Sequence, residues 1–423
     1  MAEILIKPHP LEGKINAPPS KSAAHRALIL AALSERECTV EGVAPSADMA
    51  ATLGALKGLG FAIEYRDGKA HFTGKRHTGG TPVVNCGESG STLRFMVPVA
   101  AALGIDAEFT GEGRLPSRPI SIYKEILDGR GVEVTLSDGR LPLQIRGKLK
   151  SGTFLLPGHI SSQFVTGLLL ALPFLDGDSE IILITPLEST PYVDITLEVM
   201  TSFGLSVRKT NHSYRIKGRQ HARADRFIVE GDFSQAAFWL CAGALGGPVS
   251  VGNLDPHSVQ GDKAVIQLLS RFGADVSLSG GFCTARRGTL SGIDIDASQI
   301  PDLVPALSAV AAYCKGRTRI YKAARLRDKE SDRIAATADF LEALGADVWT
   351  TPDGLVLDGK PRLKGGTCSS HGDHRIAMAA AVAAAYTDNG AKLTGCECVK
   401  KSYPGFFQDF IQLGGVADGL DMG

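Results

Sequence analysis

The segment Ala17–Leu33, APPSKSAAHRALILAAL, decides the fold of this chain. Its two prolines and its serine are typical of a helix start, and the run that follows, from Ala27 onwards, contains no polar residue. A helix without a polar face must be buried. Yet Lys21, His25 and Arg26 lie in its first turns, although the N-terminus of a helix is partially positive and favours acidic residues.

The same pattern, a turn of small residues followed by an apolar helix, recurs along the whole chain. The helix starts are about 70 residues apart, which is too long a period for a solenoid repeat. They lie at Ser22, Ser91, Ser162, Ser234, Asp302 and Asp373. Between them, amphipathic helices end at glycine and lead into short alternating strands. We therefore expect β-α-β-α-β-β units with one buried and one amphipathic helix each.

Six such units divide into two domains of three, and the predicted fold class is α/β with buried helices. The stretch Lys217–Phe227 is polar and strongly basic, and we interpret it as a solvated linker between the domains. The predicted domains are residues 17–226 and residues 1–16 together with 227–423.

The bulk composition excludes several classes of protein. The 423 residues carry a formal net charge of +0, which argues against nucleic acid or an anionic membrane as the partner. Every apolar run is shorter than the about 18 residues of a membrane span, and the first residues lack a signal-peptide pattern. The eight cysteines lack zinc-site spacing. These features indicate a cytoplasmic protein with reduced thiols.

Anions are the expected ligands of the basic helix starts. Free N–H groups at a helix N-terminus bind anions, and an external anion would supply the negative charge that the cations need. Ser22 and Arg26 share a helix face, so both can reach one phosphate. Lys329 and Arg333 share a face in the same way, although a charge run of this kind is often only a solvated helix start. Glu330 lies beside Lys329, which can perturb a carboxyl pKa.

Nine motifs together make the chain resemble the enolpyruvyl transferase family, on its EPSP synthase branch, over essentially the whole length. They are PPSKSAAHR, GESGSTLRF, LPSRPI, SSQF, STPYVDIT, IPD, KESDRI, GDHRIAMA and KSYPGFF. The resemblance implies an inside-out α/β barrel fold of two three-unit domains, with the active site in the cleft between them. It also implies that the first dozen residues return to pair with the C-terminal half.

The reaction that the resemblance implies is transfer of the enolpyruvyl group of phosphoenolpyruvate to the 5-hydroxyl of shikimate 3-phosphate. The products are 5-enolpyruvylshikimate 3-phosphate and phosphate, in the shikimate pathway to the aromatic amino acids. It further implies inhibition by glyphosate, a competitor of phosphoenolpyruvate, and a monomer that needs no cofactor or metal.

Site residues carry over from the family motifs by position. Asp302 matches the base that takes the 5-hydroxyl proton, Glu330 the acid that protonates the methylene, and Lys21 a ligand of both substrates. The implied ligands of shikimate 3-phosphate are Lys21, Ser22, Arg26, Ser161, Ser162, Gln163, Ser189, Tyr192, Asp302 and Lys329. The implied ligands of phosphoenolpyruvate are Lys21, Gly90, Arg118, Gln163, Arg333, Arg375 and Lys401.

The chain departs from the family pattern near the second apolar helix. Glu88, Ser91 and Phe95 stand where many relatives carry asparagine, threonine and proline, which bears on the response to glyphosate. Arg325 stands where some relatives carry an asparagine that contacts shikimate phosphate.

Two alternatives remain at this point. The UDP-N-acetylglucosamine enolpyruvyl transferases use a loop cysteine as general acid, and the corresponding loop Gly111–Ile120 has none. A non-catalytic anion-binding module is the other alternative. Asp302 and Glu330 argue against it, because two acids among cations would weaken anion binding.

We predict that activity does not depend on a metal ion, because side-chain cations neutralise the phosphates in these motifs and no dedicated carboxylate site for Mg²⁺ is apparent. Turnover measured with and without EDTA should be equal. Loss of activity in EDTA that a divalent ion restores would contradict this prediction.

Overall fold

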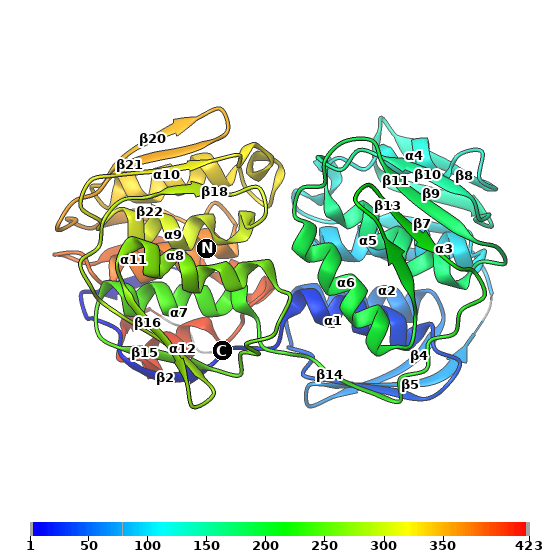
Figure 1. The fold of residues 1–423 in the computed structure, drawn as a ribbon, viewed down its shortest axis with the longest axis horizontal. Helices are drawn as coiled ribbons and strands as arrows, with labels where there is room; N and C mark the ends of the chain where they lie inside the picture. The colour runs from blue at the N-terminus through cyan, green and yellow to red at the C-terminus, as the bar shows by residue number, and fades with distance from the viewer. Residues whose placement is uncertain (1–2, 78, 420–423) are drawn as a thin grey trace. The chain divides into compact units, whose positions relative to one another are not determined.

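The computed structural model describes residues 3–77 and 79–419 (Figure 1). The chain divides into two compact units: unit 1 consists of Met1–Pro18 with Glu230–Gly423, and unit 2 of Pro19–Val229. The domain boundaries expected from the sequence, 16/17 and 226/227, precede these by two and three residues.

Unit 2 contains the elements from α1 to β14. Its helices are α1 (Lys21–Ala32), α2 (Ala47–Gly58), α3 (Gly90–Leu103), α4 (Ile122–Leu127), α5 (Ser162–Ala171) and α6 (Thr190–Ser202). Its strands are β3 (Cys38–Glu41), β4 (Phe61–Arg66), β5 (Lys69–Arg76), β6 (Val83–Asn85), β7 (Ala107–Thr110), β8 (Val132–Ser137), β9 (Arg140–Gly147), β10 (Thr153–Leu156), β11 (Ser179–Leu183), β12 (Val207–Lys209), β13 (Ser213–Ile216) and β14 (Arg226–Ile228).

Unit 1 contains the first two strands and everything after β14. Its helices are α7 (Phe233–Leu245), α8 (Val265–Phe272), α9 (Val304–Ala311), α10 (Arg333–Ala343), α11 (His374–Ala384) and α12 (Phe406–Gln412). Its strands are β1 (Glu3–Lys7), β2 (Gly13–Asn16), β15 (Val249–Gly252), β16 (Asp275–Ser279), β17 (Phe282–Arg286), β18 (Asp294–Asp296), β19 (Arg317–Tyr321), β20 (Asp347–Thr351), β21 (Gly354–Asp358), β22 (Gly366–Ser369), β23 (Ala391–Thr394) and β24 (Val416–Asp418).

Among the described residues, each unit has three four-stranded sheets of a single topology. In the sheet β6-β7-β9-β8, β6 and β7 are parallel, whereas β9 is antiparallel to both β7 and β8. Helix α3 connects β6 to β7 and α4 connects β7 to β8. The predicted β-α-β-α-β-β unit is therefore confirmed, as is the α/β class with buried helices.

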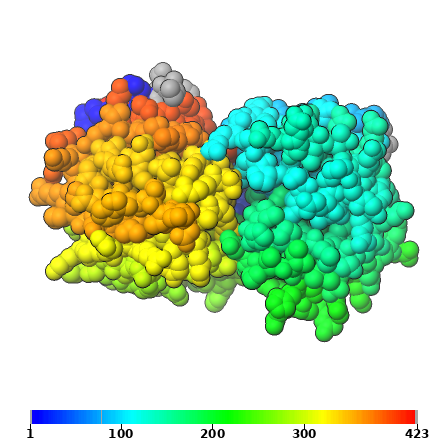
Figure 2. Space-filling view, turned by 90° about the horizontal axis from the view of Figure 1, so that it is seen from above, coloured from blue at the N-terminus to red at the C-terminus, as the bar shows by residue number. Residues whose placement is uncertain are grey.

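The N-terminal strands of the chain complete two sheets of unit 1. Strand β1 pairs antiparallel with both β23 and β24, and β2 pairs parallel with β15. In the space-filling view the blue N-terminal residues accordingly lie beside the red C-terminal residues of the same unit (Figure 2). The predicted return of the N-terminal strand to the C-terminal half is confirmed.

The sequence analysis interpreted the stretch Lys217–Phe227 as a solvated linker. In the structure it is more than a linker. Its end enters β14, which pairs parallel with β3 and so supplies the first strand of the unit that contains α1. Arg226 Nε lies 2.6 Å from Glu41 Oε1 on β3, and Phe227 stacks on Phe203. The ion pair between the two strands and the aromatic contact with the end of α6 stabilise a strand in a segment whose short, polar sequence is typical of a loop.

The first helix of each repeated unit is buried, as the apolar pattern predicts. All thirteen residues of α7 are buried, and ten of the twelve residues of α1. The predicted starts agree with the structure to within two residues. The helices begin at Lys21, Gly90, Ser162, Phe233, Val304 and His374. Since these helices lack a polar face, we expect polar and charged side chains that bind a ligand to lie at their N-terminal ends.

We predict that Ile6→Ala destabilises unit 1 by about 2–5 kcal/mol, because the fully buried Ile6 on β1 lies between two neighbouring strands. Leu5→Ala is the matched control. Leu5 is 44% exposed, so its truncation should change stability by less than about 0.5 kcal/mol. Urea unfolding measures both, and equal shifts in the two variants would show that β1 is not integral to the sheet.

Candidate active site

The start of α1 pairs its first cation with an acid inside unit 2. Lys21 Nζ lies 2.6 Å from Asp48 Oδ2, and Asp48 belongs to the first turn of α2, where the helix dipole favours a carboxylate. The expectation that only an external anion balances the cation at this helix start is therefore wrong for Lys21. The sequence analysis did not assign Asp48 a role, because the pair joins residues on two different helices.

Arg26 differs from Lys21, because its side chain donates hydrogen bonds to neutral oxygens. The side chain is 2% exposed and donates to Thr196 Oγ1 at 2.7 Å, to the Ser22 carbonyl at 2.5 Å and to the Tyr192 carbonyl at 2.8 Å. The guanidinium also lies 5.1 Å from the Phe95 ring centroid. Burial lowers the pKa of Arg26 to about 9. In the part of the chain that the structure describes, no carboxylate pairs with Arg26, so an anion would stabilise its charge.

The start of α3 brings two guanidinium groups close to Gly90. A Cβ on Gly90 would lie 2.7 Å from Arg118 Nη1 and 3.0 Å from Arg94 Nη1. Gly90 is the first residue of the helix and its φ is not positive, so glycine is needed here for space and not for backbone conformation. The helix N-terminus and two cations thus converge on one point, an arrangement that suits an anion.

Gln163 connects α5 to α3. Its Nε2 donates to Ser91 Oγ at 2.9 Å, and its Oε1 accepts a bond from Arg94 Nη1 at 2.6 Å. Arg94 also donates to the Pro119 carbonyl at 3.0 Å, next to Arg118 in the chain. Arg94, which the sequence analysis had not assigned as a ligand, therefore bonds Gln163 and lies close to Gly90, as Arg118 does.

Three predicted serines begin the neighbouring helices of unit 2. Ser161 caps α5 by accepting a bond from the Gln163 N–H at 3.3 Å, and the buried Ser162 is the first residue of that helix. Ser189 precedes α6 with a φ of 55°, a left-handed conformation that costs energy outside glycine. Such strain is concentrated at functional sites. Tyr192 lies in the first turn of α6 and accepts from Arg26.

In unit 1, Arg333 lies at the centre of a charged network. It begins α10 and is 2% exposed, and three carboxylates surround its guanidinium. The distances are 2.7 Å from Nε to Asp373 Oδ2, 2.8 Å from Nη2 to Glu330 Oε2 and 2.9 Å from Nη1 to Asp302 Oδ1. These three acids, opposed by burial, raise the pKa of Arg333. A buried guanidinium needs such partners, since an unpaired buried charge is very costly.

The other predicted residues of unit 1 join the same network. Arg375 Nη2 lies 2.9 Å from Asp302 Oδ2, and Arg375 Nη1 donates to the Asp302 carbonyl at 3.2 Å. Lys401, in the 3₁₀ helix η6 (Cys396–Lys401), lies 3.7 Å from Glu330 Oε1. The structure thus brings Asp302, Glu330, Arg333, Arg375 and Lys401 together. Asp373, recognised in the sequence only as a helix start, is an additional member.

Two further titratable groups border this network. Burial lowers the pKa of Lys329 to about 8, although the charge of Asp302 acts in the opposite direction. Burial raises the pKa of Asp262 to about 7, with a further contribution from the charge of Asp302. The Ser234 hydroxyl donates to Asp262 Oδ2. Both groups could therefore change protonation near neutral pH.

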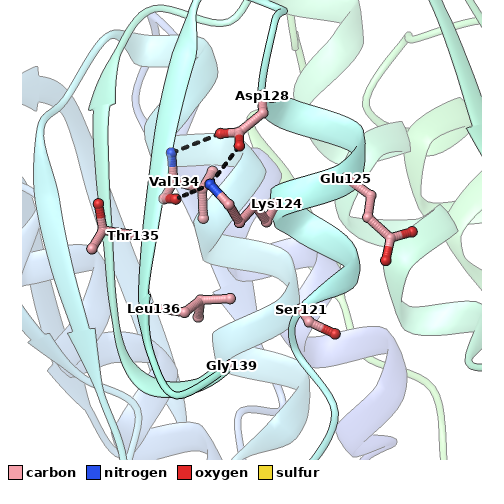
Figure 3. Close-up of a pocket in the computed structure, with 8 residues that line it drawn as sticks. All are labelled: Ser121, Lys124, Glu125, Asp128, Val134, Thr135, Leu136 and Gly139. Atoms are coloured by element: carbon pink, nitrogen blue, oxygen red, sulfur yellow. Dashed lines mark hydrogen bonds and ion pairs between the residues drawn. The ribbon is translucent and has the colours of Figure 1, made fainter.

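A pocket between α4 and the β8–β9 hairpin lies apart from these residues (Figure 3). It is lined by Ser121, Lys124, Glu125, Asp128, Val134, Thr135, Leu136 and Gly139. Lys124 Nζ lies 2.6 Å from Asp128 Oδ2 and donates to the Val134 carbonyl at 3.0 Å, so these charges satisfy each other. None of the predicted site residues lines this pocket, and it is not the candidate site.

No group of three or more His, Cys, Asp or Glu side chains in residues 3–77 and 79–419 could hold a metal ion. Within the same residues, no helix is both long and apolar enough to cross a membrane.

We predict that Lys329 titrates near pH 8, below the ordinary value of 10.5. Because the unfolded chain then binds more protons than the folded chain between these two pH values, this group makes stability rise with pH across that window. Reductive ¹³C-methylation followed by NMR measures the pKa, and Lys329→Met identifies the resonance. Titration near the ordinary lysine value would contradict the prediction.

Comparison with known proteins identifies the family. The model of the family described as EPSP synthase (3-phosphoshikimate 1-carboxyvinyltransferase) matches residues 5–410. Proteins named 3-phosphoshikimate 1-carboxyvinyltransferase from Clostridium kluyveri and Clostridium novyi are 45% and 43% identical to this chain, and each alignment covers 100% of both chains.

Solved structures show the same fold. An EPSP synthase from Acinetobacter baumannii has a TM-score of 0.83 and 28% identity over 99% of both chains. The enolpyruvyl transferase NikO from Streptomyces tendae has a TM-score of 0.79 at 18% identity over 98% of both chains, and its likeness concerns the fold alone. On the family match and the full-length relatives, this chain belongs to the EPSP synthase family.

Proposed function

We propose that this chain transfers the enolpyruvyl group of phosphoenolpyruvate to the 5-hydroxyl of shikimate 3-phosphate and releases phosphate. The observation that carries the proposal is the network of unit 1, in which Asp302 and Glu330 share the cations Arg333, Arg375 and Lys401. A base and an acid held among cations suit a reaction of two anionic substrates that includes proton transfers.

Unit 2 supplies the cations and hydroxyls for substrate anions in this proposal. Arg26 with Ser22 and Tyr192, and the helix starts at Ser161, Ser162 and Ser189, bind shikimate 3-phosphate. Lys21 and Gln163 contact both substrates. Gly90 and Arg118 bind phosphoenolpyruvate. The helix N-termini add their dipoles to these charges.

Substrate binding exchanges ion-pair partners in the proposed mechanism. Asp302 forms ion pairs with two guanidinium groups, at 2.9 Å each, and both stabilise its negative charge. When the anion of phosphoenolpyruvate takes over Arg375 and Lys401, Asp302 and Glu330 lose part of this stabilisation. Asp302 is then free to accept the 5-hydroxyl proton, and Glu330 is the proposed donor to the methylene carbon.

The atoms balance through an addition and an elimination. The 5-hydroxyl oxygen bonds to C2 of phosphoenolpyruvate while its proton goes to Asp302, and Glu330 protonates the methylene carbon. Because the product keeps its CH₂ group, one proton returns from that carbon to Glu330 as the bond from C2 to the phosphate oxygen breaks. The phosphate leaves with the electron pair of this bond, and Asp302 gives up the hydroxyl proton to the phosphate or to water. Lys329 lies near the 5-hydroxyl in this proposal.

The proposal is tested by measuring phosphate release and the enolpyruvyl product by ³¹P NMR after mixing the protein with both substrates. Each substrate alone should release no phosphate. UDP-N-acetylglucosamine with phosphoenolpyruvate should also be inactive, and activity with this acceptor would support the alternative transferase. Binding of both substrates without turnover would support a non-catalytic anion-binding protein.

We predict that Asp302→Ala and Glu330→Gln each lower kcat by about 10²–10⁴-fold, as expected for a general base and a general acid. Their effect on substrate affinity should be smaller, because the cations hold the phosphates. Glu342→Gln, at an exposed position on helix α10, which begins three residues after Glu330, is the matched control and should retain full activity. Near-normal turnover in either site variant would remove that residue from the mechanism.

We predict that glyphosate inhibits the wild-type protein and that Gly90→Ala weakens this inhibition while it retains measurable activity. The added methyl group displaces the Arg118 guanidinium, which lies 2.7 Å from the Cβ position, and glyphosate is longer than phosphoenolpyruvate. Gly54→Ala in α2 is the control, since its Cβ would meet nothing within 4 Å. Unchanged inhibition in a folded Gly90→Ala protein would show that residue 90 does not line the pocket.

Cytoplasmic location and a monomeric state stay predictions from the sequence. All eight cysteines are free in the structure, and seven of them are buried, which is compatible with a reducing compartment.

A further inference from the structure

A chain of buried hydrogen bonds runs across three helices of unit 2 and ends beside Gly90. His25 Nδ1 on α1 lies 2.7 Å from Thr52 Oγ1 on α2, which lies 2.7 Å from Thr92 Oγ1 on α3. Thr92 Oγ1 in turn donates to Ser89 Oγ at 2.8 Å. Ser89 is the N-cap of α3, and its Oγ also accepts a bond from the Thr92 N–H at 3.2 Å. We name these four side chains the α1–α3 relay.

The direction of every bond in the α1–α3 relay follows from counting protons. The Thr92 hydroxyl donates its only proton to Ser89 Oγ, so it must accept the hydrogen bond from the Thr52 hydroxyl. Thr52 then has no proton left for His25, so His25 Nδ1 must be the donor. The proton on His25 is therefore on Nδ1. His25 Nε2 is buried and has no hydrogen-bond partner in the described part of the chain, which fits an unprotonated nitrogen.

The same count leaves the hydroxyl proton of Ser89 unused within the relay. Ser89 Oγ accepts two bonds from Thr92, and among the described residues no acceptor takes its proton. Ser89 directly precedes Gly90, where the helix N-terminus and the guanidinium groups of Arg118 and Arg94 converge.

Burial makes this arrangement rigid. The four relay side chains are at most 2% exposed, so water does not compete for their hydrogen bonds. Burial also lowers the pKa of His25 to about 3, and this exceeds the effects of Asp48, Lys21 and Arg26 nearby. The imidazole is thus neutral at any working pH, and the direction of the relay does not change with pH.

We propose that His25, Thr52 and Thr92 are positioning residues that reserve the Ser89 hydroxyl proton for the anion of phosphoenolpyruvate at the start of α3. This inference rests on the proposed function. Ser89 becomes a further binding residue for that substrate. If Thr52 loses its hydroxyl, Thr92 Oγ1 no longer receives a proton, and the Ser89 hydroxyl can turn to donate to it instead of to the substrate.

Steady-state kinetics of four variants test the proposal. Ser89→Ala should raise KM for phosphoenolpyruvate about 10-fold or more, as for loss of a hydrogen bond to a charged group, and Thr52→Val should raise it about 3–10-fold. In both variants, kcat and KM for shikimate 3-phosphate should change less than about two-fold. Thr52→Ser keeps the hydroxyl and should behave as wild type. Thr337→Val is the matched control, because Thr337 is equally buried but its hydroxyl has no partner among the described residues.

The outcomes distinguish failure of the proposed function from failure of the relay proposal. If wild type shows no turnover, the proposed function fails. If wild type is active but Thr52→Val and Ser89→Ala leave KM for phosphoenolpyruvate unchanged, or raise KM for both substrates equally, the relay proposal is overturned.

A measurement on the wild-type protein covers the case in which a variant fails to fold. The ¹⁵N NMR spectrum of His25, assigned with His25→Asn, should show the neutral tautomer protonated at Nδ1 throughout the range in which the protein is folded. A proton on Nε2, or a titration of His25 near neutral pH, would overturn the relay.

Discussion

The absence of a polar face on the buried helices is the constraint on which the rest of this structure depends. Helices such as α1 and α7 are buried along their length, so a polar group can reach the surroundings only at a helix end. The N-terminal end offers free N–H groups and a partial positive charge, which favour anions. The repeated apolar helices therefore form the cores of the units. For the same reason, the cations, hydroxyls and carboxylates of the proposed site lie at the helix starts.

The cost of burying an unpaired charge explains which partners the arginines have at the helix N-termini. Arg333 is enclosed by Asp302, Glu330 and Asp373, whereas the contacts of Arg26 are to neutral oxygens. The first arrangement keeps a buried guanidinium paired in the protein itself, and the second leaves a charge that an anion would stabilise. Our account uses both arrangements. Arg26, which contacts neutral oxygens, binds a substrate anion. The cations of the Arg333 network exchange their ion pairs with Asp302 and Glu330 for contacts to the other substrate anion.

Features that depend on local pattern or on a family motif were predictable from the sequence, including the return of the N-terminal strand, whereas other pairings across the fold were not. Apolar periodicity located all six helix starts to within two residues, and the family motifs named Asp302, Arg333 and Arg375 before their contacts were known. The ion pair of Lys21 with Asp48 was missed, because 27 residues separate its members. Strand β14 was missed because only three residues form it and its partner β3 lies far away in the sequence.

The central claim is that the helix-start cations bind the substrate anions. The structure of the complex with shikimate 3-phosphate tests it most directly. Our account predicts that the phosphate or carboxylate of this ligand lies within hydrogen-bond distance of Arg26 and of the helix start at Ser162, with Asp302 at the 5-hydroxyl. A ligand bound elsewhere, with Arg26 still donating to the neutral oxygens of Ser22, Tyr192 and Thr196, would contradict the account.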